Sequence, residues 1–336
     1  MSISTVRLGR SGLQVSRLAL GTMTFGLQTE EAESQRILDK AFDAGVSFID
    51  TADVYPLGGT LQTNGRTEEI IGRWLRQHGR RDQVVLATKA VGRMGPQAWN
   101  QGASRKHLLA AIDASLARLQ TDHVDLYQLH SDDRQTPLDE TLEALDRIVQ
   151  SGRARYVGVS NFMAWRLARM IGRAELLRLA RPVSVQPRYS LLFREIEREL
   201  LPLADEEGLA VIPYNPLAGG LLSGKYRGAS SSAPPAEGRF SLGTAAKMYQ
   251  DRYWSERYFA TVDQLQALAD EAGLPLPTLA VAWVLAQPQI TTPLLGASKS
   301  EQLDATLAAA EVTLDAGLLE RLNALTADYR KGDAPR

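Results

Sequence analysis

The stretch TEEAESQRILDKAFDAGVSFIDTADVY, residues 29–55, contains the pattern that decides the fold. Its first part is acidic at the start, has helical spacing of apolar residues and closes on Gly45, which predicts a helix. The apolar run VSFID, residues 46–50, follows directly and predicts a short buried strand. This strand ends in Asp50, and a tyrosine, Tyr55, lies five residues beyond it.

The same alternation of helix and strand continues along the chain. Ser104 is a plausible N-cap for a helix over 104–120, and in the helix over 136–152 we expect Thr136 as N-cap and Pro137 at the first helical position. Parallel strands joined by helices, eight times over, predict a closed (β/α)8 TIM barrel, with an open doubly wound sheet as the alternative. The predicted strands are residues 18–21, 46–50, 84–89, 124–130, 154–160, 183–187, 209–214 and 291–296.

Three segments lie outside this repeat, although we expect residues 1–336 to form a single barrel domain. Residues 1–17 predict a small N-terminal β-hairpin. Residues 218–258, after the seventh strand, include a part rich in Ser, Pro and Gly and predict either a lid over the site or a solvated insertion. A last helix over 315–330 has no strand after it, so it should pack outside the barrel or across one end.

Composition narrows the class of protein. The chain is 44% hydrophobic and carries a formal net charge of -1, so it has no basic excess for nucleic acid. It contains no cysteine, which excludes disulfides, thiolate metal sites and cysteine nucleophiles. We find neither the apolar core of a signal peptide near the start nor a run long enough to span a membrane. These features predict a cytoplasmic protein.

Active sites of such barrels form where the strands end, so the polar residues there are site candidates. They are Asp50, Lys89, His130, Ser160, Asn161, Gln186 and Tyr214. A single polar residue at a strand end often only begins a loop. Together these residues suggest a functional site, because a buried Lys89 requires a carboxylate partner and Asp50 ends the neighbouring strand.

A lysine paired in this way and facing Tyr55 would favour the phenolate and ease proton transfer. Tyr55 is then a candidate proton donor, and His130 a neutral hydrogen-bond donor to a carbonyl oxygen. We expect the other histidines, His78, His107 and His123, to be surface residues. The segment HSDD, residues 130–133, could instead begin a metal site, but the chain has only four histidines.

A nucleotide cofactor would have to bind without the usual dinucleotide fingerprint, because no G-x-G-x-x-G follows a strand. The segment GGLLSGKY, residues 219–226, resembles a P-loop but has Tyr226 where a hydroxyl ligand for magnesium is needed. Its glycines and the segment GASKSEQL, residues 296–303, follow the last two strands, where barrels commonly bind phosphate. Ser298 and Lys299 are the phosphate partners expected there; the alternative is two glycine turns selected only for tightness.

Taken together, these motifs resemble the aldo-keto reductase family over nearly the full length. They are GTMTFG (21–26), FIDTADVY (48–55), GRTEEIIGRWL (65–75), VVLATK (84–89), VDLYQLH (124–130), ALDRIVQSGRARYVGVSNF (144–162), VQPRYSLL (185–192), YNPLAGGLLSGKY (214–226) and GASKSEQL (296–303). The resemblance implies a catalytic tetrad of Asp50, Tyr55, Lys89 and His130, with NADPH as the cofactor. The cofactor-binding residues that it implies are Gly21, Thr22, Met23, Asp50, Ser160, Asn161, Gln186, Tyr214, Leu217, Gly219, Leu221, Gly296, Ser298, Lys299 and Gln302.

Three positions depart from the family pattern. Ala305 and Thr306 stand where an acid and an asparagine are common, which should weaken the hold on adenine, and Leu295 replaces a proline. The pocket should be walled by residues 58–65, the segment after Asp132 and the segment over 218–258. The side chains expected there suggest a cyclic or aromatic apolar carbonyl substrate, unless the aromatics pack the lid itself. They are Leu57, Phe240, Tyr249, Tyr253 and Trp254.

Three functions therefore compete. The first is an NADPH-dependent enzyme that reduces an aldehyde or ketone to an alcohol. The second is an NADPH-binding sensor or regulatory subunit with weak turnover. The third is a metal-dependent barrel hydrolase. The sequence leaves the oligomeric state open.

Overall fold

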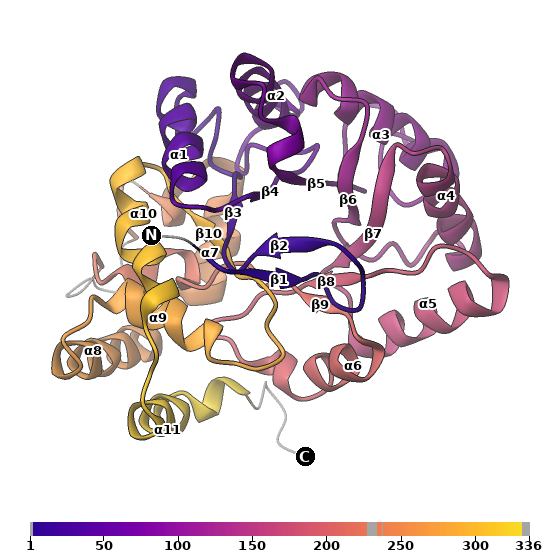
Figure 1. Cartoon of the computed structure of the whole chain (residues 1–336). Coiled ribbons are helices and arrows are strands. Elements are labelled where there is room, and N and C mark those ends of the chain that lie inside the picture. Colours follow the sequence, from indigo (N-terminus) through magenta and orange to yellow (C-terminus); the bar gives the residue numbers. More distant parts are fainter. Residues whose placement is uncertain (1–2, 227–233, 237, 331–336) are drawn as a thin grey trace.

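A computed structural model describes residues 3–226, 234–236 and 238–330, and its centre is a sheet of eight parallel strands (Figure 1). All eight predicted strands are present, in the order β10-β3-β4-β5-β6-β7-β8-β9. They are β3 (Ala19–Gly21), β4 (Phe48–Asp50), β5 (Val85–Ala90), β6 (Val124–Leu129), β7 (Ala154–Ser160), β8 (Ser184–Gln186), β9 (Ala210–Val211) and β10 (Leu294–Gly296).

The two strands at the ends of that order, β10 and β9, are also joined, by hydrogen bonds just outside their regular pairing. The Thr291 N–H donates to the Val211 carbonyl at 2.9 Å, and the Leu294 N–H donates to the Pro213 carbonyl at 2.9 Å. The sheet therefore curls into the predicted (β/α)8 barrel, and the open-sheet alternative is wrong.

Helices surround this sheet on its outer side (Figure 1). Ser104 caps α3 as predicted, accepting a hydrogen bond from the His107 N–H. The predicted cap of α4 is wrong: the helix begins after Pro137, because the Thr136 hydroxyl donates to Asp133 instead of capping. The helices are α1 (Glu31–Asp43), α2 (Arg66–His78), α3 (Arg105–Leu119), α4 (Leu138–Gln150), α5 (Ala164–Leu177), α6 (Leu200–Glu207), α7 (Ala246–Tyr253), α8 (Glu256–Glu271), α9 (Leu276–Leu285), α10 (Leu303–Leu307) and α11 (Ala316–Leu325).

The predicted N-terminal hairpin is formed by β1 (Thr5–Arg7) and β2 (Gln14–Ser16), which pair antiparallel. In Figure 1 the hairpin lies across the barrel, over the ends where the strands begin. Its Leu8 and Val15 belong to one buried apolar cluster with residues from inside the barrel, Ala19, Phe48, Ala87, Leu126, Ala210, Ile212 and Leu294. The hairpin therefore covers this end of the barrel with apolar side chains.

The segment over 218–258 is less irregular than its composition suggests. Residues 227–233 and 237 of this predicted lid lie outside the described residues. The rest contains α7 and three short 3-10 helices, Ala218–Ser223, Arg239–Ser241 and Gly243–Ala245. It therefore carries defined structure over the site rather than a bare loop.

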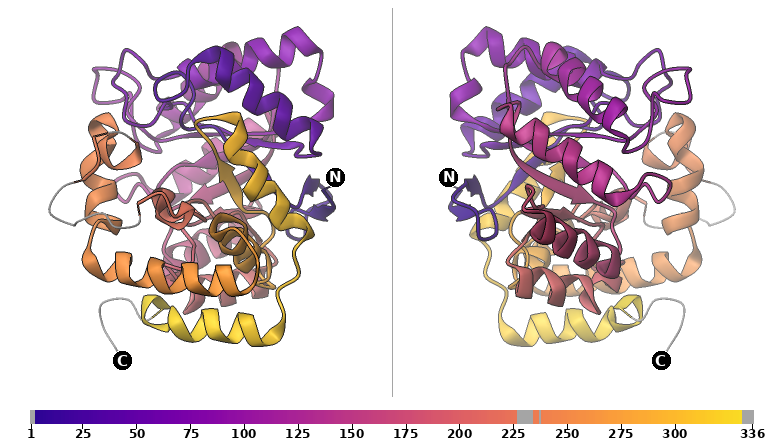
Figure 2. Two further views of the ribbon diagram at one scale, coloured as in Figure 1. Left: turned by 90° about the vertical axis from the view of Figure 1, so that its left-hand side faces the viewer. Right: turned by 90° about the vertical axis from the view of Figure 1, so that its right-hand side faces the viewer.

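The predicted C-terminal helix is α11, which lies outside the barrel beside α8 (Figure 2). Trp283 of α9 holds it through a 3.0 Å hydrogen bond from the indole N–H to Asn323. In the described part of the chain, no single helix is long and apolar enough to cross a membrane. By length and composition only α8 and α9 together reach that limit, and this pair is bent by 90°.

Candidate active site

A cavity of about 730 Å³ opens at the ends of the strands and under the segment over 218–258. Most of the residues singled out in the sequence line it: Gly21, Thr22, Met23, Asp50, Tyr55, His130, Ser160, Asn161, Gln186, Tyr214, Leu217, Gly219, Gly296, Ser298 and Gln302. Three do not. Lys89 is buried behind the cavity wall, Leu221 is 1% exposed in the core, and Lys299 is an exposed surface residue. Ala305, Thr306 and Leu295, the departures from the family pattern, also line the cavity.

The two-residue period of the strands explains why polar groups gather at this end. Side chains two residues apart on a strand share a face. Phe48 lies in the apolar interior of the barrel, and Asp50 is two residues further along the same strand. On β5, Ala87 lies in the same apolar interior and Lys89 is two residues further along. On β6, Leu126 lies there and Gln128 is two residues further along.

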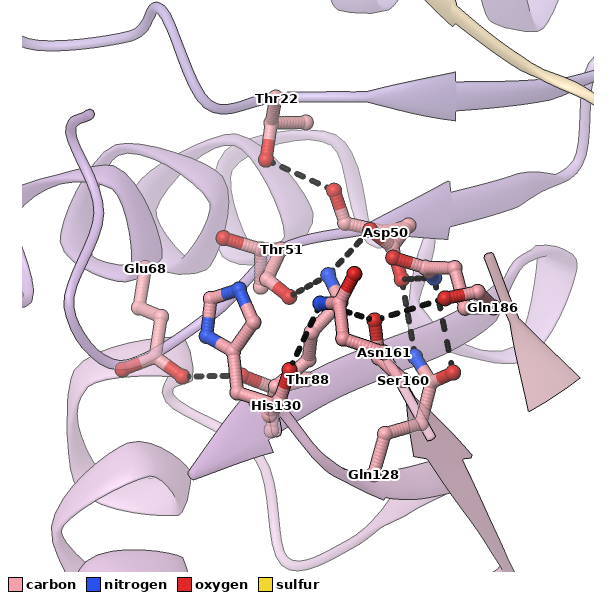
Figure 3. A network of polar contacts seen from close by, with 11 residues as sticks. Thr22, Asp50, Thr51, Glu68, Thr88, Gln128, His130, Ser160, Asn161 and Gln186 are labelled. Carbon is pink, nitrogen blue, oxygen red and sulfur yellow. Dashed lines mark hydrogen bonds and ion pairs between the residues drawn. The ribbon is translucent and has the colours of Figure 1, made fainter. Parts of the chain in front are cut away.

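Asp50 is the centre of a buried hydrogen-bond network (Figure 3). Its Oδ1 accepts a hydrogen bond from Lys89 Nζ, which also donates to the Thr51 carbonyl at 2.8 Å. Its Oδ2 accepts from Gln128 Nε2 at 3.0 Å and from Gln186 Nε2 at 2.9 Å. The predicted Asp50–Lys89 pair is thus confirmed, and four donor contacts hold the pair in one geometry.

Gln128 is a member of this network that the sequence reasoning missed. The signal was available, because Gln128 is a polar residue at an inward position of the apolar strand β6.

The Lys89 ammonium is completely buried. Burial lowers the pKa of Lys89, and the neighbouring Asp50 carboxylate opposes this effect.

Tyr55 and His130 lie edge to face beside this network and both line the cavity. Their ring centroids are 5.6 Å apart at an angle of 81°, and Lys89 Nζ is 5.2 Å from the centre of the Tyr55 ring. Burial, followed by the Lys89 charge, lowers the pKa of His130 to about 3, so its imidazole is neutral at physiological pH.

The expectation that Lys89 would favour the Tyr55 phenolate is wrong. Burial and then Asp50 raise the pKa of Tyr55 well above its ordinary value of 10. The physical reason is that Asp50 offsets the charge of Lys89, so desolvation of the phenol dominates. Tyr55 therefore holds its proton throughout the neutral range.

A second set of polar groups lies beside His130, on β7, β8 and the loop after β9. The Ser160 hydroxyl donates to the Gln186 carbonyl at 2.8 Å, and Asn161 Nδ2 donates to the His130 carbonyl at 2.9 Å (Figure 3). The Tyr214 hydroxyl donates to Asn161 Oδ1 at 2.8 Å. These bonds fix a flat polar wall that faces the cavity.

A further buried group lies on the outer face of the sheet. Glu68 of α2 accepts hydrogen bonds from the Thr88 hydroxyl at 2.6 Å and from Arg118 at 2.7 Å. Asp53 is fully buried near them, and burial followed by the Glu68 charge raises its pKa well above the usual carboxyl range. The sequence reasoning singled out none of these residues.

The histidine and metal predictions have mixed outcomes. His107 is buried at 4% exposure, so its placement on the surface was wrong: the α3 face that carries it packs inward. In the HSDD segment, Asp132 pairs with Arg166 at 3.0 Å, and Asp133 accepts from the Ala103 N–H at 2.8 Å. Among the residues that the structure describes, no three His, Cys, Asp or Glu side chains form a metal-binding group.

The glycine segment after β9 forms one wall of the cavity. Gly219 and Gly220 have φ of 70° and 100°, and a Cβ on Gly219 would lie 2.9 Å from the Tyr249 ring. A Cβ on Gly220 would lie 3.8 Å from Lys225 Nζ. Only glycine fits this path without strain. Gly219, Gly220 and Lys225 all line the cavity, so backbone and the Lys225 cation face it together.

Polar atoms without partners occur along the same cavity. Gln28 Oε1 and Arg239 Nη1 are buried and, within the described residues, have no hydrogen-bond partner. Both side chains line the cavity. The unpaired Arg239 donor fits an anionic group of a ligand and the unpaired Gln28 acceptor fits a hydroxyl or amino group, because a buried donor or acceptor left unpaired is costly.

The lid aromatics turn out mainly to pack against each other. Phe240, Tyr253 and Trp254 do not line the cavity, and the Phe240 and Trp254 ring centroids are 4.6 Å apart. Of the side chains expected in the pocket, only Leu57 and Tyr249 line it. The lid instead presents three cations to the cavity, Lys225, Arg239 and Arg252. Lys225 belongs to the GGLLSGKY segment, and no motif in the sequence indicated the other two.

Comparison with known proteins gives consistent matches over nearly the whole chain. A sequence model described as "Aldo/keto reductase family" matches residues 17–327. The "Uncharacterized oxidoreductase YrpG" of Bacillus subtilis is 42% identical, covering 94% of each chain. A "Probable voltage-gated potassium channel subunit beta" of Arabidopsis thaliana is 37% identical, covering 91% of this chain and 90% of its own. The "L-glyceraldehyde 3-phosphate reductase" of Escherichia coli is also 37% identical, covering 88% and 84%.

Proposed function

Since the chain belongs to the aldo/keto reductase family, we propose that this oxidoreductase reduces a small aldehyde or ketone to an alcohol with NADPH, and that Tyr55 is the general acid. The observation that carries the proposal is the pairing of a protonated phenol with a neutral imidazole at one wall of the cavity. We further propose that the chain works as one barrel unit in the cytoplasm.

Tyr55 and His130 have complementary parts in this proposal. A carbonyl oxygen gains negative charge during reduction, so it needs a proton or strong hydrogen bonds. Tyr55 supplies the proton, because its phenol stays protonated in the cavity. His130, neutral at physiological pH, donates a hydrogen bond that orients the same oxygen.

Asp50 and Lys89 act behind Tyr55 in this proposal. Lys89 lies over the face of the Tyr55 ring, 5.2 Å from its centre, and helps to hold the ring in place. Asp50 holds Lys89 in place and is itself fixed by Gln128 and Gln186. Removing either member of the pair would therefore disturb both the fold and the acid.

The residues along the cavity fit a dinucleotide. Bound NADPH supplies the hydride for the carbonyl carbon. Ser160, Asn161 and Gln186 offer a polar wall for the carboxamide, beside the Tyr214 ring. Lys225 and Arg239, next to the glycine segment, offer charge to the pyrophosphate, and Ser298, Gln302 and Gln28 line the adenosine end.

Lys225→Met and Arg239→Met are expected to weaken NADPH binding by about ten- to hundredfold each, because each removes a charge-assisted contact. The dissociation constant can be measured by fluorescence titration of NADPH at low and high salt. The matched control is Lys106→Met on the surface of α3, where Lys106 lies over Trp99. An unchanged dissociation constant in both pocket variants would remove the assignment of these cations to the cofactor.

The experiment that tests the function is NADPH oxidation by the pure protein with short aldehydes and with quinones, beside the same reactions with NADH. We expect turnover with NADPH to exceed turnover with NADH. An absence of turnover with every carbonyl compound, despite tight NADPH binding, would contradict the proposal.

A second candidate follows from the similarity to proteins named as potassium channel β subunits. A regulatory subunit would bind NADPH tightly and turn over slowly. The same assay separates the two functions, because a sensor is expected to show tight binding without appreciable rates.

A further inference from the structure

Of the three cations that the lid presents to the cavity, Arg252 has no role in the function proposed so far. Arg252 lies on α7, and residues three and four apart on a helix share a face. Met248 and Tyr249 accordingly line the cavity together with Arg252. Its guanidinium carbon is 6.0 Å from the centre of the Tyr249 ring. The helix therefore presents a cation to the space in which substrate must bind.

Arg252 forms no ion pair with any of the described residues. The other lysine or arginine of the same helix, Lys247, faces outward and pairs with Asp251. Arg252 is only partly exposed, and a partly buried guanidinium without a counter-ion is unfavourable. A ligand with a negative group would supply the missing partner, and guanidinium binds carboxylate and phosphate through two parallel hydrogen bonds.

The position of Arg252 differs from that of Lys225, one of the two cations assigned to the cofactor phosphates. Lys225 lies beside Gly220 in the glycine segment. Arg252 lies within hydrogen-bond reach of the Tyr214 hydroxyl, which itself donates to Asn161 of the polar wall. Burial raises the pKa of Tyr214, and among the groups that oppose this rise Arg252 acts most strongly, followed by Arg188. Of these two arginines, Arg252 lines the cavity, so its positive charge faces the reacting end.

We propose that Arg252 binds an acidic group, a carboxylate or a phosphate ester, on the carbonyl substrate, so that the natural substrate is an anionic aldehyde or ketone. This inference rests on the proposed function and replaces the expectation of an apolar aromatic substrate, since the lid aromatics pack inside the lid. Arg252 is then a specificity-determining residue, because it binds the acidic group at the end of the substrate remote from the carbonyl.

The test compares aldehydes matched in length but not in charge. Succinic semialdehyde is paired with butanal, and glyceraldehyde 3-phosphate with glyceraldehyde. In the wild type, we expect kcat/KM to be about ten- to hundredfold higher for the charged member of at least one pair, the value of one charge-assisted contact. High salt should reduce this ratio. The pair with the larger ratio identifies the acidic group.

Variants then assign the preference to Arg252. Arg252→Met should bring the charged-to-neutral ratio close to one, mainly through KM, and Arg252→Lys should keep part of it. The control is Lys247→Met on the outer face of the same helix, which should keep the wild-type ratio. NADPH dissociation constants are measured for each variant.

The outcomes are distinguishable. Equal kcat/KM for charged and neutral aldehydes in the wild type, or an unchanged ratio in Arg252→Met, overturns the inference and leaves the reductase function intact. Weaker NADPH binding in Arg252→Met, with equal losses for all substrates, assigns Arg252 to the cofactor and overturns it as well. No NADPH oxidation with any of the four aldehydes overturns the proposed function, and the inference with it.

Discussion

Tyr55→Phe is expected to lower the rate of carbonyl reduction by about 10²–10⁴-fold, the range for loss of a general acid. The phenylalanine ring keeps the edge-to-face packing with His130, so the change removes the hydroxyl and little else. The loss should appear in kcat, because the proton is needed in the transition state. The measurement is the steady-state rate of NADPH oxidation with a reactive aldehyde, beside the dissociation constant of NADPH.

The matched control is Tyr127→Phe. Tyr127 is buried on the outer face of the barrel, where its hydroxyl donates to the Leu108 carbonyl at 3.3 Å, away from the cavity. Its loss should leave the rate within a few-fold of the wild type. Equal rates in wild type and Tyr55→Phe would show that another group protonates the oxygen.

The pH profile of the wild type follows from the same two groups. His130 has a pKa of about 3, so it is neutral above about pH 4, and the pKa of Tyr55 lies above its ordinary value of 10. Both groups therefore keep one protonation state from about pH 5 to 9. The activity should fall only as pH rises toward the elevated pKa of Tyr55, where the acid is lost.

Lys89→Met is expected to lower the free energy of unfolding by about 3–5 kcal/mol, because it leaves a buried carboxylate without its cation. Asp50 is 1% exposed and Lys89 is fully buried, so water cannot replace the lost partner. Asp50→Asn should cost a similar amount by leaving the ammonium unpaired. Guanidinium denaturation of the two variants measures both losses.

The double variant Asp50→Asn with Lys89→Met isolates the interaction. Its loss should be smaller than the sum of the single losses, because no unpaired charge remains. Lys247→Met serves as control, since its ion pair with Asp251 is exposed and such pairs contribute at most about 1 kcal/mol. A Lys89→Met variant as stable as the control would mean that Asp50 takes up a proton at little cost.

The barrel was predictable because its signals are local and repeated. Each apolar run sits between helical segments, and β7 even has the predicted bounds, 154–160. Strand ends were harder to place. The run over 209–214 contains only Ala210–Val211 as a strand, because Pro213 interrupts the ladder.

The site was predictable where neighbouring strands bring residues together. Asp50 and Lys89 follow this rule, since β4 and β5 are adjacent. Contacts across the barrel cannot be predicted in this way. Gln186 lies 136 residues from Asp50, so the sequence suggested a cofactor role for Gln186 but not its hydrogen bond to the Asp50 carboxylate. Arg252 reaches the cavity through the fold of the lid, which no periodicity describes.

The hairpin and the closure of the barrel have a consequence for folding during synthesis. β3, the first strand of the barrel to leave the ribosome, pairs with β10, the last. Leu8 and Val15 of the hairpin are covered by a cluster that includes Ala210, Ile212 and Leu294. Until those residues have emerged, the N-terminal apolar side chains lack part of their cover. The growing chain therefore keeps part of its N-terminal apolar surface exposed until its last strand docks.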